Sequence, residues 1–174
     1  VGLIISAPII GLFALLIKRE DSAGPVIYRQ VRSGLKGKPF TIYKMRSMRV
    51  DAEENGGAQW AKENDPRRLK IGAFMRETNI DELPQFWNVL AGHMSLVGPR
   101  PMMVSQRSEY FGQSYYRMRP GITGLWQVSG RAGIDDFSDW IALDLRYIDQ
   151  WSLWLDLRIL LRTMPALLKQ QNAY

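Results

Sequence analysis

The sequence predicts a mostly α-helical chain with one small β-hairpin, attached to a membrane through its N-terminus. First, residues 1–17 contain no charged side chain. Second, two stretches rich in β-branched and aromatic residues, 24–34 and 38–48, meet at a glycine-containing loop and predict a hairpin. Third, residues 135–148 and 151–168 predict two helices late in the chain. The length of 174 residues predicts one domain with a core of its own.

The apolar N-terminus leaves three interpretations open. As a straight helix, residues 1–17 would span roughly 25 Å, slightly less than the ~30 Å hydrocarbon core of a bilayer. Pro8 removes a backbone donor in the middle of this run and kinks a helix there. The segment is therefore a short spanning helix, a kinked helix that enters and leaves on one side, or a buried core helix, and the membrane interpretations are favoured. A signal peptide is disfavoured because the basic residues follow the apolar run, and Lys18 and Arg19 predict that the next domain is cytoplasmic.

Positive charge is concentrated in one segment. Residues 18–49 hold nine Lys and Arg against two acids, a net charge of +7, whereas the whole chain carries +6. Such a segment suits nucleic acid, anionic lipid or a phosphorylated substrate. The chain has no cysteine, which excludes disulfides, cysteine zinc sites and thiol catalysis, and its single histidine argues against a histidine-based triad.

Two adjacent acids, Asp81 and Glu82, lie in the stretch NIDELPQFWN. Pro84 is tolerated only in the first turn of a helix, so a helix is expected to begin close to Asp81 and to end at Gly92. The free amides of a helix start would favour an ionised Asp81, which could act as a nucleophile. Glu82 could ligate Mg²⁺ together with phosphate oxygens. On this feature alone, an ordinary charged helix start remains the commoner explanation.

Two loops carry arginines of the kind that bind phosphate. Residues 95–102 and 119–131 are rich in glycine and proline and are expected to lack regular structure. Arg100 lies between two prolines and Arg131 ends the second loop. Arginine binds phosphate oxygens through two parallel hydrogen bonds, so these loops and the acidic pair together indicate a phosphate-handling site with a metal.

Four long motifs give the chain a recognisable resemblance. VIYRQVRSGLKGKPFTIYKMRSM, TNIDELPQFWNVLAGHMSLVGPRP, RPGITGLWQVSGR and DLRYIDQWSLWLDLRILLRT, in this order, resemble the bacterial sugar transferases. These are monotopic polyprenyl-phosphate phosphoglycosyl transferases, and the wording ITGLWQVSGR is most similar to the undecaprenyl-phosphate galactose phosphotransferase branch. The resemblance covers essentially the whole chain.

The resemblance implies a reaction and its residues. A hexose 1-phosphate would move from a UDP-sugar to undecaprenyl phosphate with release of UMP, which would initiate O-antigen, capsule or exopolysaccharide synthesis. By matching motifs, Asp81 would be the nucleophile that forms a covalent phosphosugar–enzyme, and Glu82 would be the catalytic acid associated with Mg²⁺. The matched motifs also imply a set of substrate-binding residues, namely Lys44, Arg100, Gln127, Arg131 and Asp156.

The resemblance also implies a topology. Residues 1–22 would form a re-entrant membrane helix kinked at Pro8, and residues 23–174 a catalytic domain on the cytoplasmic face of the bacterial inner membrane. From their own pattern, residues 151–168 suit a helix at the lipid interface, where tryptophan is favoured, and a core-facing helix of a soluble domain is the alternative. One departure is that the family often has Ser-Pro at the kink, where this chain has Ala7-Pro8. Membrane lipid is an expected partner, and a homodimer stays open.

Two other function classes compete with the transferase. A non-catalytic, membrane-associated scaffold of polysaccharide assembly would explain the amphipathic helices and the basic segment, but not the arginine loops beside an acidic pair. Nucleic-acid binding rests on charge alone and is not expected, because the N-terminus is apolar and no nucleic-acid motif is present. The sequence does not choose between galactose, glucose and an N-acetylated sugar.

Overall fold

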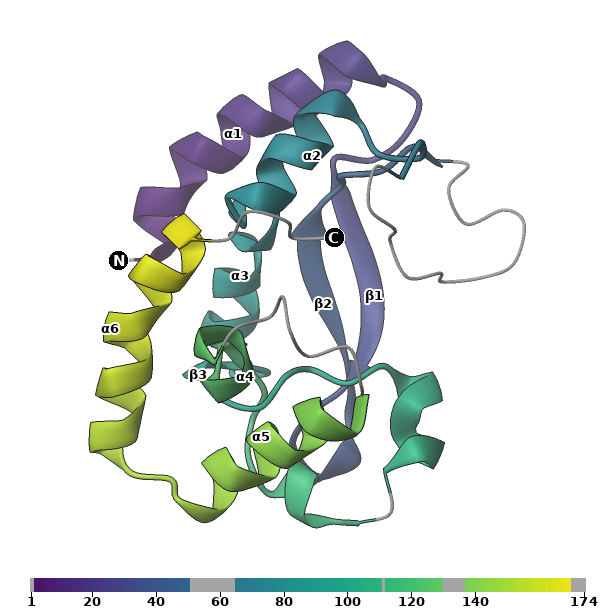
Figure 1. Cartoon of the computed structure of the whole chain (residues 1–174). Coiled ribbons are helices and arrows are strands. Elements are labelled where there is room, and N and C mark those ends of the chain that lie inside the picture. Colours follow the sequence, from purple (N-terminus) through teal and green to yellow (C-terminus); the bar gives the residue numbers. More distant parts are fainter. Residues whose placement is uncertain (1, 51–64, 111, 130–136, 170–174) are drawn as a thin grey trace.

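The computed structural model describes residues 2–50, 65–110, 112–129 and 137–169. These residues form a mostly helical chain with a small antiparallel hairpin, as predicted (Figure 1). The elements, with 3-10 helices labelled η, are α1 (Gly2–Glu20), β1 (Ile27–Ser33), η1 (Leu35–Gly37), β2 (Pro39–Met45), α2 (Lys70–Glu77), η3 (Ile80–Glu82), α3 (Gln85–Leu90), β3 (Ser95–Val97), η4 (Val104–Glu109), η5 (Ser114–Arg117), β4 (Gly121–Thr123), α4 (Leu125–Val128), α5 (Phe137–Asp149) and α6 (Leu153–Lys169).

Helix α1 is apolar and mostly exposed. By length and composition it could cross a membrane, and only 17% of its most apolar 18-residue window is buried. Several of its large side chains, such as those of Ile4 and Leu15, are exposed. This exposure disfavours the interpretation as a buried core helix. The helix continues through Pro8, and the hydroxyl of the buried Ser6 donates to the carbonyl of Leu3.

The predicted hairpin is confirmed. Strands β1 and β2 pair in antiparallel fashion from Ile27 opposite Met45 to Ser33 opposite Pro39. The connecting turn requires left-handed backbone at Lys36 and Gly37, with φ values of 57° and 70°. Glycine adopts this conformation without steric cost, which explains the glycine-containing loop.

Both glycine-rich segments contain regular structure, so the prediction that they lack it is wrong. Residues 95–97 form β3, which pairs in parallel with β4. A Cβ atom on Gly121 would overlap the backbone of Gly98, and one on Gly98 would overlap the carbonyl of Arg119. These glycines therefore serve close backbone approach between two strands, and α4 follows directly after β4.

The acidic pair lies in a 3-10 turn rather than in an α-helix. Asp81 and Glu82 belong to η3, and α3 begins at Gln85 with Pro84 as its N-cap residue. At the other end, Gly92 ends the helix with φ 75°, as predicted. Its amide donates to Val89 and the next amide donates to Asn88, which together form a Schellman motif.

One apolar cluster joins α1, α2 and the end of β2. It contains Phe13 and Ile17 of α1, Met45 of β2, and Leu69 and Met75 from the region of α2. Helix α2 begins at Lys70 and ends at Glu77. The cluster places α2 between the N-terminal helix and the end of β2, immediately before the turn that carries the acidic pair.

The two predicted C-terminal helices are present. Residues 137–149 form α5 and residues 153–169 form α6. The fully buried Tyr147 and Ile159 pack with Val97 in a second cluster, which joins both helices to β3. In Figure 1, α1 and α6 lie along one side of the molecule, and α2 and α3 lie between that side and the hairpin.

Candidate functional site

An ion pair joins two of the residues that the sequence analysis selected. Nζ of Lys44, on β2, lies 2.8 Å from Oε1 of Glu82, in η3. Both side chains are partly exposed, 27% for Lys44 and 17% for Glu82, so the pair is accessible to a ligand. The structure thus brings together residues that lie 38 positions apart in the chain.

A buried asparagine fixes the distance between β2 and this turn. Asn88, fully buried in α3, accepts a hydrogen bond from the amide of Tyr43 at 3.1 Å through Oδ1. Its Nδ2 donates to the carbonyl of Thr41 at 2.7 Å. Asn88 therefore satisfies both backbone groups on the edge of β2 that faces away from β1. The sequence analysis missed this residue because an asparagine in an amphipathic helix resembles a solvent-exposed position.

Asp81 is buried beside an arginine. Its side chain is only 7% exposed, and Arg76 in the last turn of α2 is attracted to its charge. Burial lowers the pKa of Arg76, and the opposing attraction to Asp81 favours the charged guanidinium. Nε of Arg76 donates to Oγ of Ser47 at 2.9 Å, which orients the guanidinium. Arg76 thus supplies positive charge near the predicted nucleophile, a role that the sequence analysis did not assign.

Several backbone amides near Asp81 are already hydrogen-bonded within the turn and the start of α3. The amides of Glu82 and Leu83 donate to the carbonyls of Asn79 and Ile80, at 3.1 and 3.2 Å. The amides of Phe86 and Trp87, in the first turn of α3, are also bonded to carbonyls three residues earlier. A 3-10 turn closes its hydrogen bonds early and leaves these donors satisfied. The charge of Arg76 adds to the positive environment of Asp81.

Arg100 packs against two tryptophan rings. Its Cζ atom lies 4.1 Å from the centre of the Trp140 ring and 5.0 Å from the centre of the Trp126 ring. Both separations suit cation–π attraction. The amide of Arg100 donates to Oδ2 of Asp144 at 3.0 Å. The loop around Arg100 is thus held by α5 through Asp144 and Trp140, and by α4 through Trp126.

Asp144 is an unusual carboxyl group that the sequence analysis missed. It is 2% exposed, and burial raises its pKa to about 7, although the amide and charge of Arg100 oppose this rise. Among the described residues, no group bonds to its Oδ1 atom or to the hydroxyl of the nearby Tyr115, whose pKa is also raised by burial. The sequence does not reveal that Asp144 is buried, because an acid in an amphipathic helix is usually expected at an exposed position.

Arg32 connects the acidic pair with the Arg100 loop. Its Nη1 donates to the carbonyl of Pro101 at 3.0 Å, and the amide of Ser33 donates to the carbonyl of Met102 at 2.9 Å. Burial lowers the pKa of Arg32, whereas attraction to Tyr28, Tyr115 and Glu82 raises it. The loop that follows Arg100 is therefore bound to the end of β1, and the charge of Arg32 acts on Glu82.

The structure describes two of the three remaining predicted site residues. Gln127 is buried in α4, next to Trp126, and none of the described residues bonds to its Oε1 atom. Asp156 accepts hydrogen bonds from the hydroxyl of Tyr147 at 2.7 Å and from Nε1 of Trp151 at 3.3 Å, so it ties α6 to the end of α5. Arg131 lies outside the described residues.

The acidic pair fits a magnesium ion only if a substrate supplies further ligands. Across the described ranges, no three His, Asp or Glu side chains are grouped closely enough to hold a metal by themselves. Mg²⁺ typically binds one or two protein carboxylates together with substrate phosphates, so Glu82 matches the protein share of such a site. Glu82 would then share its carboxylate between Lys44 and the metal.

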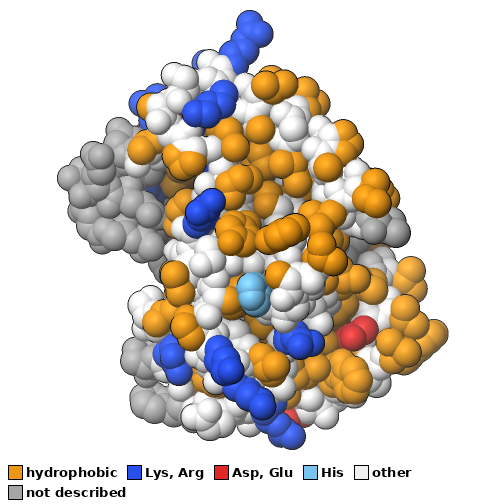
Figure 2. Space-filling model, turned by 180° about the vertical axis from the view of Figure 1, so that it is seen from behind, with side chains coloured by type: hydrophobic (Ala, Val, Ile, Leu, Met, Phe, Trp, Pro, Cys, Tyr) orange, Lys and Arg blue, Asp and Glu red, His pale blue; other side chains and the backbone are white. Residues whose placement is uncertain are grey.

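One face of the molecule is apolar and exposed. Leu90, at the end of α3, is 70% exposed, and Leu161 of α6 is 77% exposed. Further exposed side chains continue this surface, which we call the apolar face, along α1, α3 and α6: Ile4, Ile5, Leu12, Leu15, Trp87, Trp151, Leu153, Trp154 and Met164. Figure 2 shows hydrophobic side chains gathered along the edge where α1 and α6 lie. A monomeric soluble protein rarely exposes so large an apolar surface.

Comparison with known proteins gives a family match over almost the whole chain. A model of the family described as bacterial sugar transferase matches residues 1–170. A galactosyl transferase of Streptococcus agalactiae is 46% identical, over 96% of this chain and 40% of its own length. A UDP-glucose:undecaprenyl-phosphate glucose-1-phosphate transferase of Caulobacter vibrioides is also 46% identical, over 97% of this chain and 66% of its own length.

A third relative carries the name that the sequence resemblance suggested. An undecaprenyl-phosphate galactose phosphotransferase of Salmonella typhimurium is 41% identical, over 99% of this chain. The chain spans 39% of that relative's length. The region of this chain that the family model matches includes the acidic turn and the Arg100 loop.

Proposed function

Because the chain belongs to the bacterial sugar transferase family, we propose that it transfers a hexose 1-phosphate from a UDP-sugar to undecaprenyl phosphate and releases UMP. The names of the Caulobacter and Salmonella relatives support both the lipid acceptor and a sugar phosphate as the group transferred. The sugar is glucose or galactose, the two hexoses that occur in those names. The product would begin the synthesis of a surface polysaccharide.

The first half-reaction uses Asp81 as the nucleophile. A carboxylate oxygen of Asp81 attacks the phosphorus that bears the sugar, and the bond from that phosphorus to the bridging oxygen breaks. UMP leaves with the bridging oxygen, and an aspartyl-phosphosugar remains on the protein. The buried position of Asp81 supports this role, because few water molecules could reach the intermediate and hydrolyse it.

The second half-reaction returns Asp81 to its starting form. A phosphate oxygen of undecaprenyl phosphate attacks the same phosphorus, and the bond to Asp81 breaks. The lipid then carries a diphosphate-linked hexose. One nucleophile in this way serves a water-soluble donor and a lipid acceptor in turn.

The cations around Asp81 neutralise the phosphate charge that both steps concentrate there. Arg76 lies beside Asp81, and Lys44 orients Glu82 through its ion pair. Bound Mg²⁺, held by Glu82 with phosphate oxygens, would supply further neutralisation of that charge. Pre-placed charges of this kind stabilise a phosphoryl-transfer transition state without reorganisation.

The donor would extend from Asp81 toward the Arg100 loop. Arg100, held in a fixed position by Trp126 and Trp140, presents a rigid guanidinium to a nucleotide phosphate. Gln127 lies next to Trp126 and would contact the nucleotide or the sugar. Arg131 and Asp156 are proposed to complete the substrate-binding set, in keeping with the family resemblance.

The apolar face would hold the site at the membrane surface. Residues 1–22 would enter and leave the bilayer on one side, with Pro8 at the bend, on the cytoplasmic face of the inner membrane. The exposed tryptophans of α6 and of the segment before it suit the lipid headgroup layer. This placement would bring Asp81 to the depth of the lipid phosphate.

The observation that carries the proposal is the buried Asp81 next to the Lys44–Glu82 ion pair. The test is incubation of the purified protein with UDP-hexose that is radiolabelled in the sugar, without lipid acceptor. We expect one equivalent of UMP and labelled protein from the wild type, and neither from Asp81→Asn at unchanged thermal stability. Near-normal UMP release by Asp81→Asn would overturn the assignment of the nucleophile.

The same experiment separates the transferase from a scaffold of polysaccharide assembly. The apolar face suits a membrane-bound scaffold equally well. A scaffold would acquire no label and release no UMP from any UDP-sugar. A screen of UDP-glucose, UDP-galactose and their N-acetylated counterparts, with UMP release as the readout, would identify the donor.

A further inference from the structure

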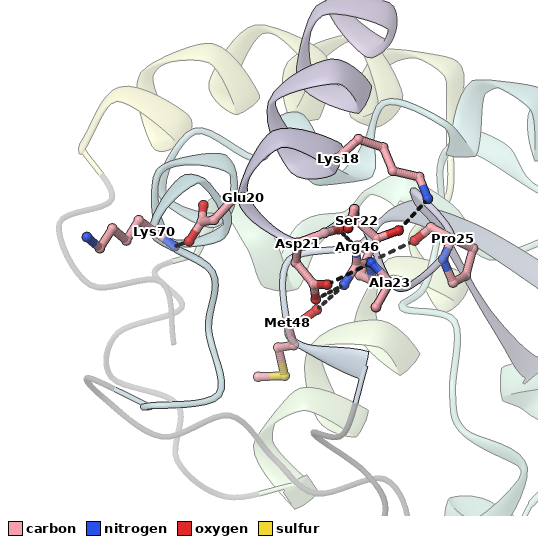
Figure 3. A network of polar contacts seen from close by, with 9 residues as sticks. All are labelled: Lys18, Glu20, Asp21, Ser22, Ala23, Pro25, Arg46, Met48 and Lys70. Carbon is pink, nitrogen blue, oxygen red and sulfur yellow. Dashed lines mark hydrogen bonds and ion pairs between the residues drawn. The ribbon is translucent and has the colours of Figure 1, made fainter.

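Two adjacent acids at the end of α1 reach different parts of the catalytic domain. Glu20 and Asp21 are the only acidic residues within the basic segment 18–49. Figure 3 shows Glu20 directed toward Lys70 at the start of α2, and Asp21 directed toward Arg46, just beyond β2. Neither acid has a role in the proposed chemistry, so their contacts call for a different explanation.

Glu20 caps helix α2 from a distance of 50 positions in the chain. Its Oε1 accepts a hydrogen bond from the amide of Lys70 at 2.6 Å, and its Oε2 accepts one from the amide of Ile71 at 3.0 Å. The N-cap residue of α2 is Leu69, which has no side-chain acceptor of its own. A helix is normally capped by the residue that begins it. Here α1 supplies the cap, so the end of α1 and the start of α2 are fixed to each other.

Asp21 and Arg46 fix the connection that follows α1. Arg46 is 5% exposed, and its Nη1 lies 2.5 Å from Oδ2 of Asp21. The same guanidinium donates to the carbonyl of Asp21 at 2.7 Å and to that of Pro25 at 2.8 Å. The hydrogen bond from Arg46 also lowers the pKa of Asp21 and keeps the carboxylate charged. The segment between α1 and β1 therefore has no freedom to act as a loose hinge.

Helix α2 extends this fixed geometry to the acidic turn. It is eight residues long, and its Phe74 stacks on Phe13 of α1 with ring centres 6.1 Å apart. A Cβ atom on Gly72 would overlap the carbonyl of Ser47, so the helix lies directly on the backbone that follows β2. Its last turn carries Arg76, and Asp81 follows four residues after the helix ends.

From these contacts we infer that Glu20 is a positioning residue, which sets the nucleophile Asp81 relative to the membrane helix through α2. The inference rests on the proposed function and deepens it. The donor arrives from water and meets Asp81, Glu82, Lys44 and Arg76, all within the catalytic domain. The acceptor phosphate lies at the depth of the lipid headgroups, so its approach depends on how α1 is joined to the site. Loss of the cap should therefore impair the lipid half-reaction more than the donor half-reaction.

The test compares both half-reactions in full-length protein reconstituted in nanodiscs that contain undecaprenyl phosphate. Glu20→Gln keeps one acceptor oxygen but loses the charge, Glu20→Ala loses both hydrogen bonds, and Glu20→Asp keeps the carboxylate. Glu77→Gln is the matched control, because Glu77 is an exposed carboxylate on the same helix, α2. Thermal unfolding of each variant shows whether it is folded.

We expect the UMP burst without lipid to stay within about twofold of wild type in Glu20→Gln and Glu20→Ala. Transfer to undecaprenyl phosphate should fall at least tenfold, with a raised KM for the lipid and with labelled protein accumulating at steady state. Glu20→Asp should recover part of the loss, and Glu77→Gln should behave as wild type. An equal fall of both half-reactions, or no fall in either, would overturn the positioning role. A wild-type protein that gives no UMP burst would instead overturn the proposed function itself.

Discussion

Nζ of Lys44 lies 2.8 Å from Oε1 of Glu82, and this ion pair joins the hairpin to the turn that carries Asp81. The pair is partly exposed, so it contributes little to the stability of the fold, about 1 kcal/mol at most. Its consequence is geometric, because a lysine on a strand and a glutamate in a 3-10 turn are held in one place beside a buried carboxylate. The ion pair is therefore expected to matter more for catalysis than for the stability of the fold.

Lys44→Met should impair catalysis and spare stability. Glu82 would lose its partner, and the site would lose a positive charge near the phosphate, so we expect UMP release to fall on the order of 10²-fold. Lys38→Met, which removes an exposed lysine at the start of the same half of the hairpin, is the control and should have little effect. A steady-state assay of UMP release with parallel thermal unfolding would check this. Equal losses in the two variants would indicate a general effect of charge.

Asn88→Ala should have the opposite profile and destabilise the protein. The substitution leaves the amide of Tyr43 and the carbonyl of Thr41 buried without their partner, at a cost of about 2 to 4 kcal/mol. Asn88→Asp would bury an ionised carboxylate against the carbonyl of Thr41, so at neutral pH it should destabilise the protein at least as much as Asn88→Ala. Denaturant unfolding in detergent micelles would measure both, and an unchanged midpoint for Asn88→Ala would contradict the role of Asn88 at the strand edge.

Asp144 should make the stability of the protein depend on pH. Its pKa is raised from 3.8 to about 7 by burial, so between these values the folded protein holds a proton that the unfolded chain releases. The free energy of unfolding should therefore fall as pH rises from about 4 to about 7, and this contribution should level off above that range. Asp144→Asn keeps an acceptor for the amide of Arg100 and should show a flatter profile. Thermal unfolding of both proteins at pH 5 and pH 8 would reveal the difference, and parallel profiles would refute it.

The apolar face should bind lipid without supporting the fold. Leu161 is 77% exposed, whereas Ile159 on the same helix is 1% exposed. Leu161→Gln should lower binding to anionic liposomes severalfold and leave thermal stability unchanged, because its side chain contacts little protein. Ile159→Ala is the reciprocal control and should cost about 2 to 5 kcal/mol of stability. Liposome flotation and thermal unfolding would separate the two effects, and equal liposome binding by Leu161→Gln and wild type would count against this surface.

The hairpin and the helices α1, α5 and α6 could be predicted from sequence because each depends on local signals. Strand-forming residues flank a glycine turn at Gly37, and apolar periodicity runs for several turns in α5 and α6. The parallel pairing of β3 and β4 could not be predicted. Its strands have three residues each, and Gly98 and Gly121 resemble loop punctuation until the backbones are seen to approach each other.

The candidate site was predictable only where family motifs or charge marked it. Lys44 and Glu82 were selected, and they are in contact. Arg32, Asp144 and Asn88 were missed, because their burial results from contacts with distant segments. The orientation of α3 was also missed. Its buried face carries the polar side chains of Gln85 and Asn88, whereas the apolar Trp87 and Leu90 are exposed.

In the mechanism that we propose, Asp81 carries the phosphosugar between donor and lipid. The most direct measurement is intact-protein mass spectrometry after incubation with the UDP-hexose donor and no acceptor, followed by peptide mapping. We predict a mass increase of one hexose phosphate, located on Asp81, which disappears when undecaprenyl phosphate is added. UMP release without any adduct, or an adduct located on Glu82 instead, would contradict the account.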